Sequence, residues 1–142
     1  MRRPGFTLIE LQTAHFLGFT VLLLAGLLLF YETERQIRVD REVKLRLALT
    51  RVDATLQWQL WRAESVSIAP QKITIDLRDE TWAFGGDGVF ADGIDQFTGE
   101  PTLRLIDTEI RDDTLVASFT ATIGEQATTA RFQYYLPSGS AP

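Results

Sequence analysis

Apolar residues fill most of the chain from Phe6 to Phe30, and this run predicts one membrane-spanning helix. It covers 25 residues, about 37 Å as an α-helix, whereas a hydrocarbon core is about 30 Å thick. Its first half is interrupted by a few polar residues, Glu10, Gln12, Thr13 and His15. Because Arg2 and Arg3 precede the span, the positive-inside rule predicts a cytoplasmic amino terminus and an extracytoplasmic remainder.

Beyond Phe30 the pattern stays helical but becomes amphipathic. Acidic and basic residues recur four apart, which stabilises a helix, in the pairs Glu34 and Arg38, Asp40 and Lys44, and Glu42 and Arg46. No glycine or proline interrupts the sequence between Phe30 and Pro70. We therefore expect a single helix from Phe6 to about Ala63.

The distal part of this helix carries two apolar stripes rather than one. At 100° per residue, the first stripe comprises Leu45, Leu49, Val52, Leu56 and Leu60, and the second stripe comprises Val43, Leu47, Ala54, Trp58 and Trp61. Two interpretations remain open. A single wrapping sheet buries both stripes, or one stripe takes the chain's own sheet and the other takes a neighbouring subunit.

After Ala63 the pattern changes to strands. Period-two alternation and β-branched residues predict strands over 66–68, 72–77, 102–106, 114–123 and 128–136, with a short one over 81–84. Residues 85–95 are rich in glycine and aspartate and are interpreted as a loop, and 124–127 as a hairpin turn. The expected fold is α+β, with one long helix packed on a small antiparallel sheet of four to six strands. The polar tail 137–142 is expected to fray.

Composition and charge narrow the possible functions. The 142 residues include no cysteine and one histidine, so disulfides, thiolate catalysis and cysteine metal sites are excluded. Residues 64–142 carry 5 basic and 13 acidic side chains within a net charge of −5, which disfavours direct nucleic-acid binding. No catalytic constellation is visible. We expect no enzyme activity and no cofactor.

Two further groups of residues have weak functional interpretations. Asp87, Asp92 and Asp95 supply oxygen ligands for calcium, but their spacing differs from that of an EF-hand, and a solvated turn is favoured over a metal site. His15 lacks a closely spaced acidic partner, so a polar contact between packed helices is favoured over a proton relay.

Glu10 is the residue that a plain membrane anchor does not explain, because a carboxylate in hydrocarbon costs roughly 2.5–3.5 kcal/mol or more. A secretory signal peptide is disfavoured, since no small-x-small cleavage pattern follows the apolar run. The stretch Gly5-Phe6-Thr7-Leu8-Ile9-Glu10, after a short basic leader and before a long apolar helix, resembles the type IV prepilin signature of pilins and pseudopilins.

The resemblance implies a pilin-like fold and a defined processing step. A prepilin peptidase would cleave between Gly5 and Phe6 and the new terminus of Phe6 would be N-methylated. Residues 1–5 would be the removed leader, 6–30 the transmembrane and filament-core helix, 31–64 its amphipathic continuation and 65–142 an extracytoplasmic β-sheet domain. Glu10, four residues after Phe6 and on the same helix face, would pair with the amino group of a neighbouring subunit.

The implied function is that of a minor pilin or pseudopilin in a type IV pilus-like filament. The expected partners are other pilin or pseudopilin subunits, the prepilin peptidase, an assembly platform in the cytoplasmic membrane, and membrane lipid. The competence pseudopilus, which serves DNA uptake, is preferred because Trp58 to Trp61 followed by Lys72 and Ile73 is similar to competence minor pseudopilins. The alternatives are a minor pseudopilin of type II secretion or a minor type IV pilin. A different class, a membrane-anchored extracytoplasmic binding or enzymatic domain, also stays open.

Overall fold

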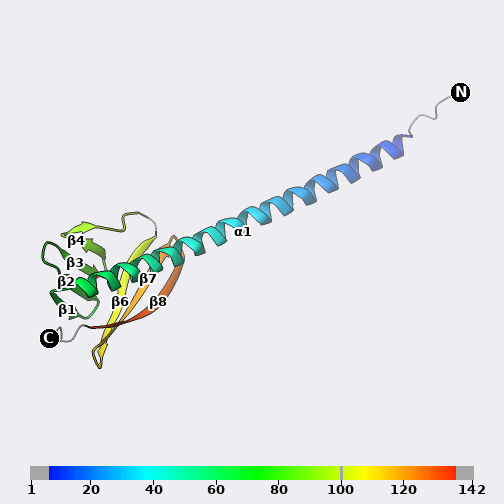
Figure 1. Ribbon diagram of the computed structural model, residues 1–142. Coiled ribbons are helices and arrows are strands. Elements are labelled where there is room, and N and C mark those ends of the chain that lie inside the picture. The colour runs from blue at the N-terminus through cyan, green and yellow to red at the C-terminus, as the bar shows by residue number, and fades with distance from the viewer. Residues whose placement is uncertain (1–6, 100, 137–142) are drawn as a thin grey trace. The chain divides into compact units, whose positions relative to one another are not determined.

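The computed structural model of the chain describes residues 7–99 and 101–136 and has an α+β architecture (Figure 1). One helix, α1 (Leu8–Arg62), precedes eight strands. The expected helix and the antiparallel pairing of the strands are confirmed. The chain divides into two compact parts, residues 1–40 and residues 41–142, and each is described by itself. The leader, Gly5, Phe6 and the tail 137–142 lie outside the described residues.

The strands form two antiparallel sheets. The first has five strands in sequence order, β1 (Ser65–Ala69), β2 (Lys72–Asp76), β3 (Thr81–Gly85), β4 (Gly88–Ala91) and β5 (Ile94–Asp95). The second has three, β6 (Thr102–Arg111), β7 (Thr114–Ile123) and β8 (Gln126–Tyr135). Eight strands in two sheets replace the single sheet of four to six strands that the pattern predicts.

Short turns account for most of the extra strands. The loop expected over 85–95 contains β4 and β5, joined by a two-residue turn at Asp92 and Gly93 with φ of 48° and 79°. An Asp-Gly pair favours this left-handed hairpin turn, and its signal was hidden by the surrounding glycines. Strand β6 continues past Ile106, where the predicted strand ends. The prediction ended there because a register shift between Leu105 and Asp107 breaks the alternation of apolar and polar residues.

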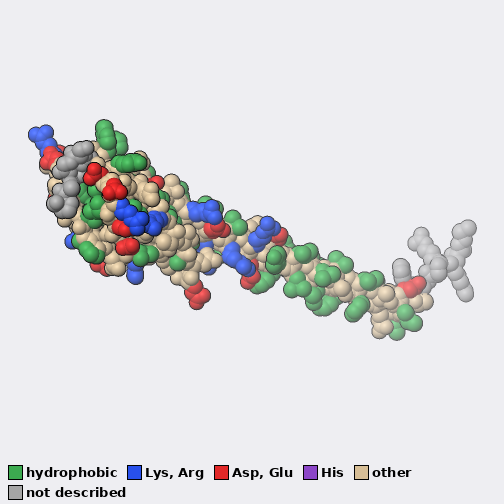
Figure 2. Space-filling view, turned by 90° about the horizontal axis from the view of Figure 1, so that it is seen from below, with side chains coloured by type: hydrophobic (Ala, Val, Ile, Leu, Met, Phe, Trp, Pro, Cys, Tyr) green, Lys and Arg blue, Asp and Glu red, His purple; other side chains and the backbone are tan. Residues whose placement is uncertain are grey.

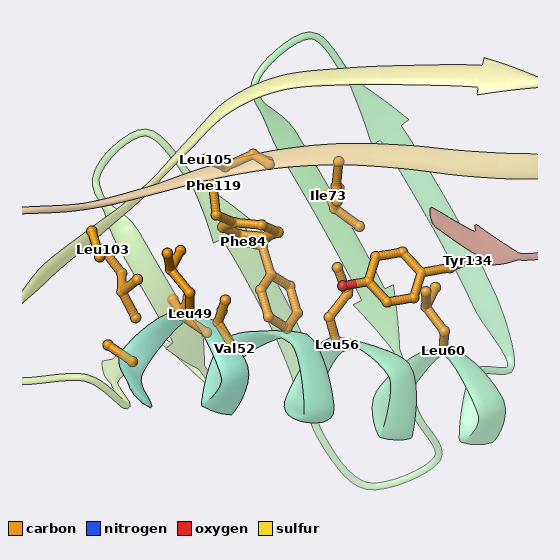
Figure 3. Close-up of a cluster of buried hydrophobic side chains, with 14 of the residues drawn as sticks. Leu49, Val52, Leu56, Leu60, Ile73, Phe84, Leu103, Leu105, Phe119 and Tyr134 are labelled. Atoms are coloured by element: carbon orange, nitrogen blue, oxygen red, sulfur yellow. The ribbon is translucent and has the colours of Figure 1, made fainter. Parts of the chain in front are cut away.

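The core lies within residues 41–142, between the first stripe of α1 and the inner faces of both sheets (Figure 3). The largest fully buried side chains include Phe84 and Phe119, whose rings meet edge to face at 6.3 Å between centroids. Alternate residues of β2 and β7 point into this core, which agrees with their apolar alternation in the sequence. The part of the helix within residues 41–142 therefore has a buried side that faces the core and an exposed side.

Candidate functional site: the exposed faces of the long helix

The apolar run of α1 is exposed in the single chain. Every residue of Leu8–Tyr31 is exposed except the half-buried Thr20. Figure 2 shows hydrophobic side chains gathered along this part of the helix. This is the one helix among the described residues that is long and apolar enough to cross a membrane. Burial in lipid, or against other helices in lipid, would remove this apolar surface from water.

Three polar side chains inside this run make hydrogen bonds to carbonyl groups of the helix itself. The Thr13 hydroxyl donates to the carbonyl of Ile9 at 2.8 Å, and the Thr20 hydroxyl donates to that of Phe16 at 2.8 Å. His15 Nδ1 lies 2.9 Å from the carbonyl oxygen of Leu11. With Nδ1–H as the donor, the ring is held along the helix surface. This arrangement suits a residue that packs against another helix, which is the interpretation favoured over a proton relay.

Thr7 and Glu10 form a reciprocal cap at the start of α1. The backbone N–H of Thr7 donates to Glu10 Oε2 at 2.8 Å and its hydroxyl donates to the same oxygen at 3.0 Å, while the Glu10 N–H donates to Thr7 Oγ1 at 3.3 Å. This is a capping box, which satisfies donors that a helix start leaves without partners. Glu10 therefore has hydrogen-bond partners in its own chain, although its position in the apolar run alone suggests that it has none.

The cap leaves one acceptor of Glu10 unused. Both bonds from Thr7 reach Oε2, and no hydrogen bond or cation reaches Oε1 from the described part of the chain. A carboxylate can accept up to about four hydrogen bonds. Oε1 can thus take a donor from outside the chain while Oε2 stays in the cap. The sequence signal for this device, a threonine three residues before a glutamate, was present in the motif but was not used to predict the cap.

A shallow depression of about 450 Å³ follows Glu10 along one side of the helix. Its lining residues are spaced three and four apart: Leu11, Ala14, His15, Gly18, Phe19 and Leu22. A Cβ added at Gly18 would meet nothing within 4 Å. The chain itself therefore does not require glycine there. Small residues between larger ones allow another helix to approach closely in a membrane.

The two stripes of the distal helix have different environments. Every residue of the first stripe is buried, and Leu56 is fully buried. Every residue of the second stripe is exposed, with Leu47 at 66 % and Trp61 at 79 % exposure. The rings of Trp58 and Trp61 contact each other at 5.7 Å between centroids. The sheets of the chain therefore cover the first stripe and leave the second stripe as an apolar surface.

One polar contact fixes the helix to the three-stranded sheet, and sequence reasoning missed it. The Tyr134 hydroxyl on β8 donates to Asp53 Oδ1 on α1 at 2.7 Å. Burial raises the pKa of Tyr134, and the nearby Asp53 carboxylate raises it further. Asp53 borders the first stripe and has no basic residue four positions away, which was the available signal that its partner lies elsewhere in the fold.

Two of the three weak calcium candidates accept hydrogen bonds from nearby backbone groups. Asp92 Oδ1 accepts the backbone N–H of Thr81 at 2.8 Å, and Asp95 Oδ1 accepts that of Phe97 at 2.9 Å. Within residues 7–99 and 101–136, no three acidic or histidine side chains are grouped so that they could hold a metal ion. Asp87 and Asp92 lie in turns as interpreted, whereas Asp95 ends strand β5.

Known protein families, curated proteins and solved structures offer no match to this chain. Its functional interpretation therefore depends on the residues and the geometry described above.

Proposed function

We propose that this chain is a minor pilin or pseudopilin subunit of a type IV pilus-like filament. The observation that carries the proposal is the construction of α1. Its apolar first half is exposed except at Thr20, while its distal part packs on antiparallel sheets through the side that carries the first stripe and leaves the second stripe exposed. A subunit of this kind enters the membrane by its helix and exchanges lipid for other helices when it assembles.

The proposed processing creates the donor that Glu10 lacks. Cleavage between Gly5 and Phe6 gives Phe6 a new amino terminus, which is then N-methylated. Glu10 Oε1, unused by the cap, accepts that amino group from a neighbouring subunit. Pairing two charges in a medium of low dielectric is strongly favoured over leaving either one alone. Assembly thus neutralises a negative charge in the membrane that the bonds from Thr7 satisfy only in part.

The exposed second stripe supports a second contact between subunits, outside the membrane. Of the two interpretations that the sequence left open, the chain's own sheets now account for the first stripe only. A neighbouring subunit would cover the second stripe, and its two tryptophans would supply much of the buried area. The assembly platform and the prepilin peptidase complete the set of proposed partners. The protein resides in the cell membrane as a single-pass chain until it joins an envelope filament.

Among filament systems we favour the competence pseudopilus, which serves DNA uptake. The acidic distal half argues that this subunit does not bind DNA directly. Its contribution would be to the filament itself. Deletion of the chain should abolish transformation and leave protein secretion intact. Loss of secretion with normal transformation would instead assign the chain to type II secretion.

Mass spectrometry of the membrane-extracted protein tests the class of protein directly. The proposal expects a mature chain that begins with N-methylated Phe6. A Gly5→Leu variant should retain its leader, because a side chain at the cleavage position obstructs the peptidase. Gly26→Ala is the matched control, since a Cβ there meets nothing within 4 Å. An intact Met1 start in the unmodified protein would instead indicate a membrane-anchored domain of another class.

A further inference from the structure

Two polar side chains in the apolar run of α1 lack a full set of partners within the described part of the chain. The side-chain amide of Gln12 makes no hydrogen bond to residues 7–99 or 101–136. His15 uses Nδ1 in its 2.9 Å contact with the carbonyl oxygen of Leu11, and its Nε2 makes no hydrogen bond to those residues. With Nδ1–H as the donor, Nε2 is an acceptor without a donor, while the Gln12 amide has donors without acceptors.

Both side chains start within the hydrocarbon when α1 spans a membrane. The apolar run is about 7 Å longer than the hydrocarbon is thick, whereas Gln12 and His15 follow the start of the run by about 9 Å and 14 Å along the helix. Both positions therefore stay inside the hydrocarbon even if the whole excess lies on the cytoplasmic side. An amide or a ring nitrogen without a hydrogen-bond partner is costly there. A neighbouring helix that bonds to these groups would remove that cost.

Gln12 and His15 flank one face of the helix. At 3.6 residues per turn, they lie about 60° apart around the axis and about 4.5 Å apart along it. The midline between them carries Leu8, Phe19 and Gly26, each within about 10° of it. Leu8 and Phe19 are exposed, and a Cβ added at Gly26 would meet nothing within 4 Å. The face thus combines two polar flanks with apolar and small residues on which a second helix can pack.

A second copy of the helix presents the complementary groups at matching depth. Copies of one chain share their orientation in the membrane, so their helices run parallel. When two parallel helices meet along this midline about a twofold axis, the Gln12 flank of each helix faces the His15 flank of the other. The contact of Nδ1 with the Leu11 carbonyl holds the His15 ring toward the preceding turn, which brings Nε2 closer to the height of Gln12. Two equivalent hydrogen bonds can therefore form.

We propose that α1 forms a parallel dimer with a second copy of this chain in the membrane, in which the Gln12 amide of each helix donates a hydrogen bond to His15 Nε2 of the other. The chain supplies both donor and acceptor, whereas a different membrane helix would need a donor of its own at the depth of His15. Glu10 lies about 170° around the helix from the midline and takes no part. The dimer thus goes beyond the filament role, because it uses neither cleavage after Gly5 nor pairing by Glu10.

Cysteine crosslinking tests the dimer, because the chain has no cysteine of its own. Phe19→Cys places a thiol on the midline, and Leu17→Cys places one about 160° away at nearly the same depth. Both positions are exposed in the single chain. The full chains are reconstituted in lipid vesicles at a low ratio of protein to lipid and oxidised. Phe19→Cys should give a disulfide-linked dimer and Leu17→Cys should not. Equal dimer yields, or no dimer from Phe19→Cys, would overturn the proposal.

A rescue experiment tests the hydrogen bonds themselves. In the Phe19→Cys background, Gln12→His sets one acceptor against another and should reduce the dimer yield about tenfold. Adding His15→Gln exchanges donor and acceptor between the two positions and should restore the yield. Thr13→Val, which removes a hydroxyl that bonds to the Ile9 carbonyl in the same helix, should leave the yield unchanged. A yield that stays low in the exchanged variant would contradict the pairing, even if packing still brings the helices together.

Native membranes distinguish a second copy from a different protein. Two differently tagged forms of the Phe19→Cys chain, produced in the same cells, should be joined in one product with the mass of two chains. A product that contains another protein in place of the second copy would overturn the proposal. Adding Gly5→Leu should leave the dimer yield unchanged, and a loss of the dimer would contradict its independence from processing. An intact Met1 start with a normal dimer yield would overturn the filament role alone.

Discussion

The hydroxyl of Tyr134 on β8 donates a 2.7 Å hydrogen bond to the carboxylate of Asp53 on α1, and so ties the helix to the edge of the three-stranded sheet. The contact joins residues 81 positions apart in the sequence. Figure 3 shows Tyr134 reaching over the helix beside Leu56 and Leu60. Its partly buried position makes it a specific contact that orients the helix, in addition to the apolar packing around it.

Removing this hydrogen bond should lower stability. Tyr134→Phe keeps the ring in the core and leaves Asp53 without its donor, so we expect the free energy of unfolding to fall by about 1–2 kcal/mol. Tyr135→Phe is the matched control, because Tyr135 is exposed and should cost less than about 0.5 kcal/mol. Thermal unfolding of the full chain in detergent, followed by near-ultraviolet circular dichroism, measures both. Equal losses in the two variants would show that the bond to Asp53 contributes little.

The same contact predicts a pH dependence. Burial and Asp53 raise the pKa of Tyr134 in the folded state, whereas the pKa of a tyrosine in the unfolded chain is about 10. The folded state holds the proton where the unfolded state releases it, so this stabilisation is complete below about pH 10 and declines above it. The decline should be smaller in Tyr134→Phe. Parallel stability curves from about pH 9 to 11 for the two proteins would argue against the raised pKa.

The two stripes of α1 predict a large and a small effect on stability for two leucines of the same helix. Leu56→Ala removes a fully buried side chain and should lower the free energy of unfolding by about 2–5 kcal/mol. Leu47→Ala, on the exposed second stripe, should change it by less than about 0.5 kcal/mol. Filament incorporation should instead fall for Leu47→Ala combined with Trp58→Ala. Normal incorporation of that double variant would remove the second stripe from the proposed interface.

Features that depend on residues close together in the sequence could be predicted from it, and features that depend on contacts between distant residues could not. The helix from Leu8 to Arg62 and the long strand β7 follow from uninterrupted local periodicity. The hairpin turns do not, because they depend on backbone conformations such as that of the left-handed Asp112-Asp113 pair between β6 and β7, with φ of 45° and 62°. Glu10 was identified from its cost in a membrane, while its cap with Thr7 needed the geometry of the first turn. The Asp53 and Tyr134 contact depends on tertiary packing and had only a weak local signal.

Gln59 gives a prediction of increased stability. Its side chain lies within the buried side of α1 at 5 % exposure, and its Oε1 has no hydrogen-bond partner among residues 7–99 and 101–136. A buried acceptor without a partner costs about 1–3 kcal/mol. Gln59→Leu should therefore raise the free energy of unfolding by about 1 kcal/mol and the melting temperature by about 4–8 °C. Gln57→Leu, at an exposed position, is the control. A lower melting temperature for Gln59→Leu would mean that the amide makes a contact that leucine cannot replace.

Variants at Glu10 and Thr7 separate the contribution of the Glu10 charge from that of the cap. Glu10→Gln keeps an oxygen that can accept hydrogen bonds from Thr7 and removes the negative charge, so processing should continue while filament incorporation falls. Thr7→Val removes the hydroxyl that bonds Glu10 but leaves the charge, and Thr7→Ser restores a capping hydroxyl. We expect incorporation to be reduced less by Thr7→Val than by Glu10→Gln, and to be normal for Thr7→Ser.

Glu32→Gln, at an exposed pair with Arg35, controls for loss of one helix charge. Mass spectrometry of the amino terminus and the amount of each variant in sheared filaments measure the two steps separately. Undiminished incorporation of processed Glu10→Gln would rule out charge pairing by Glu10 as the driving force for assembly.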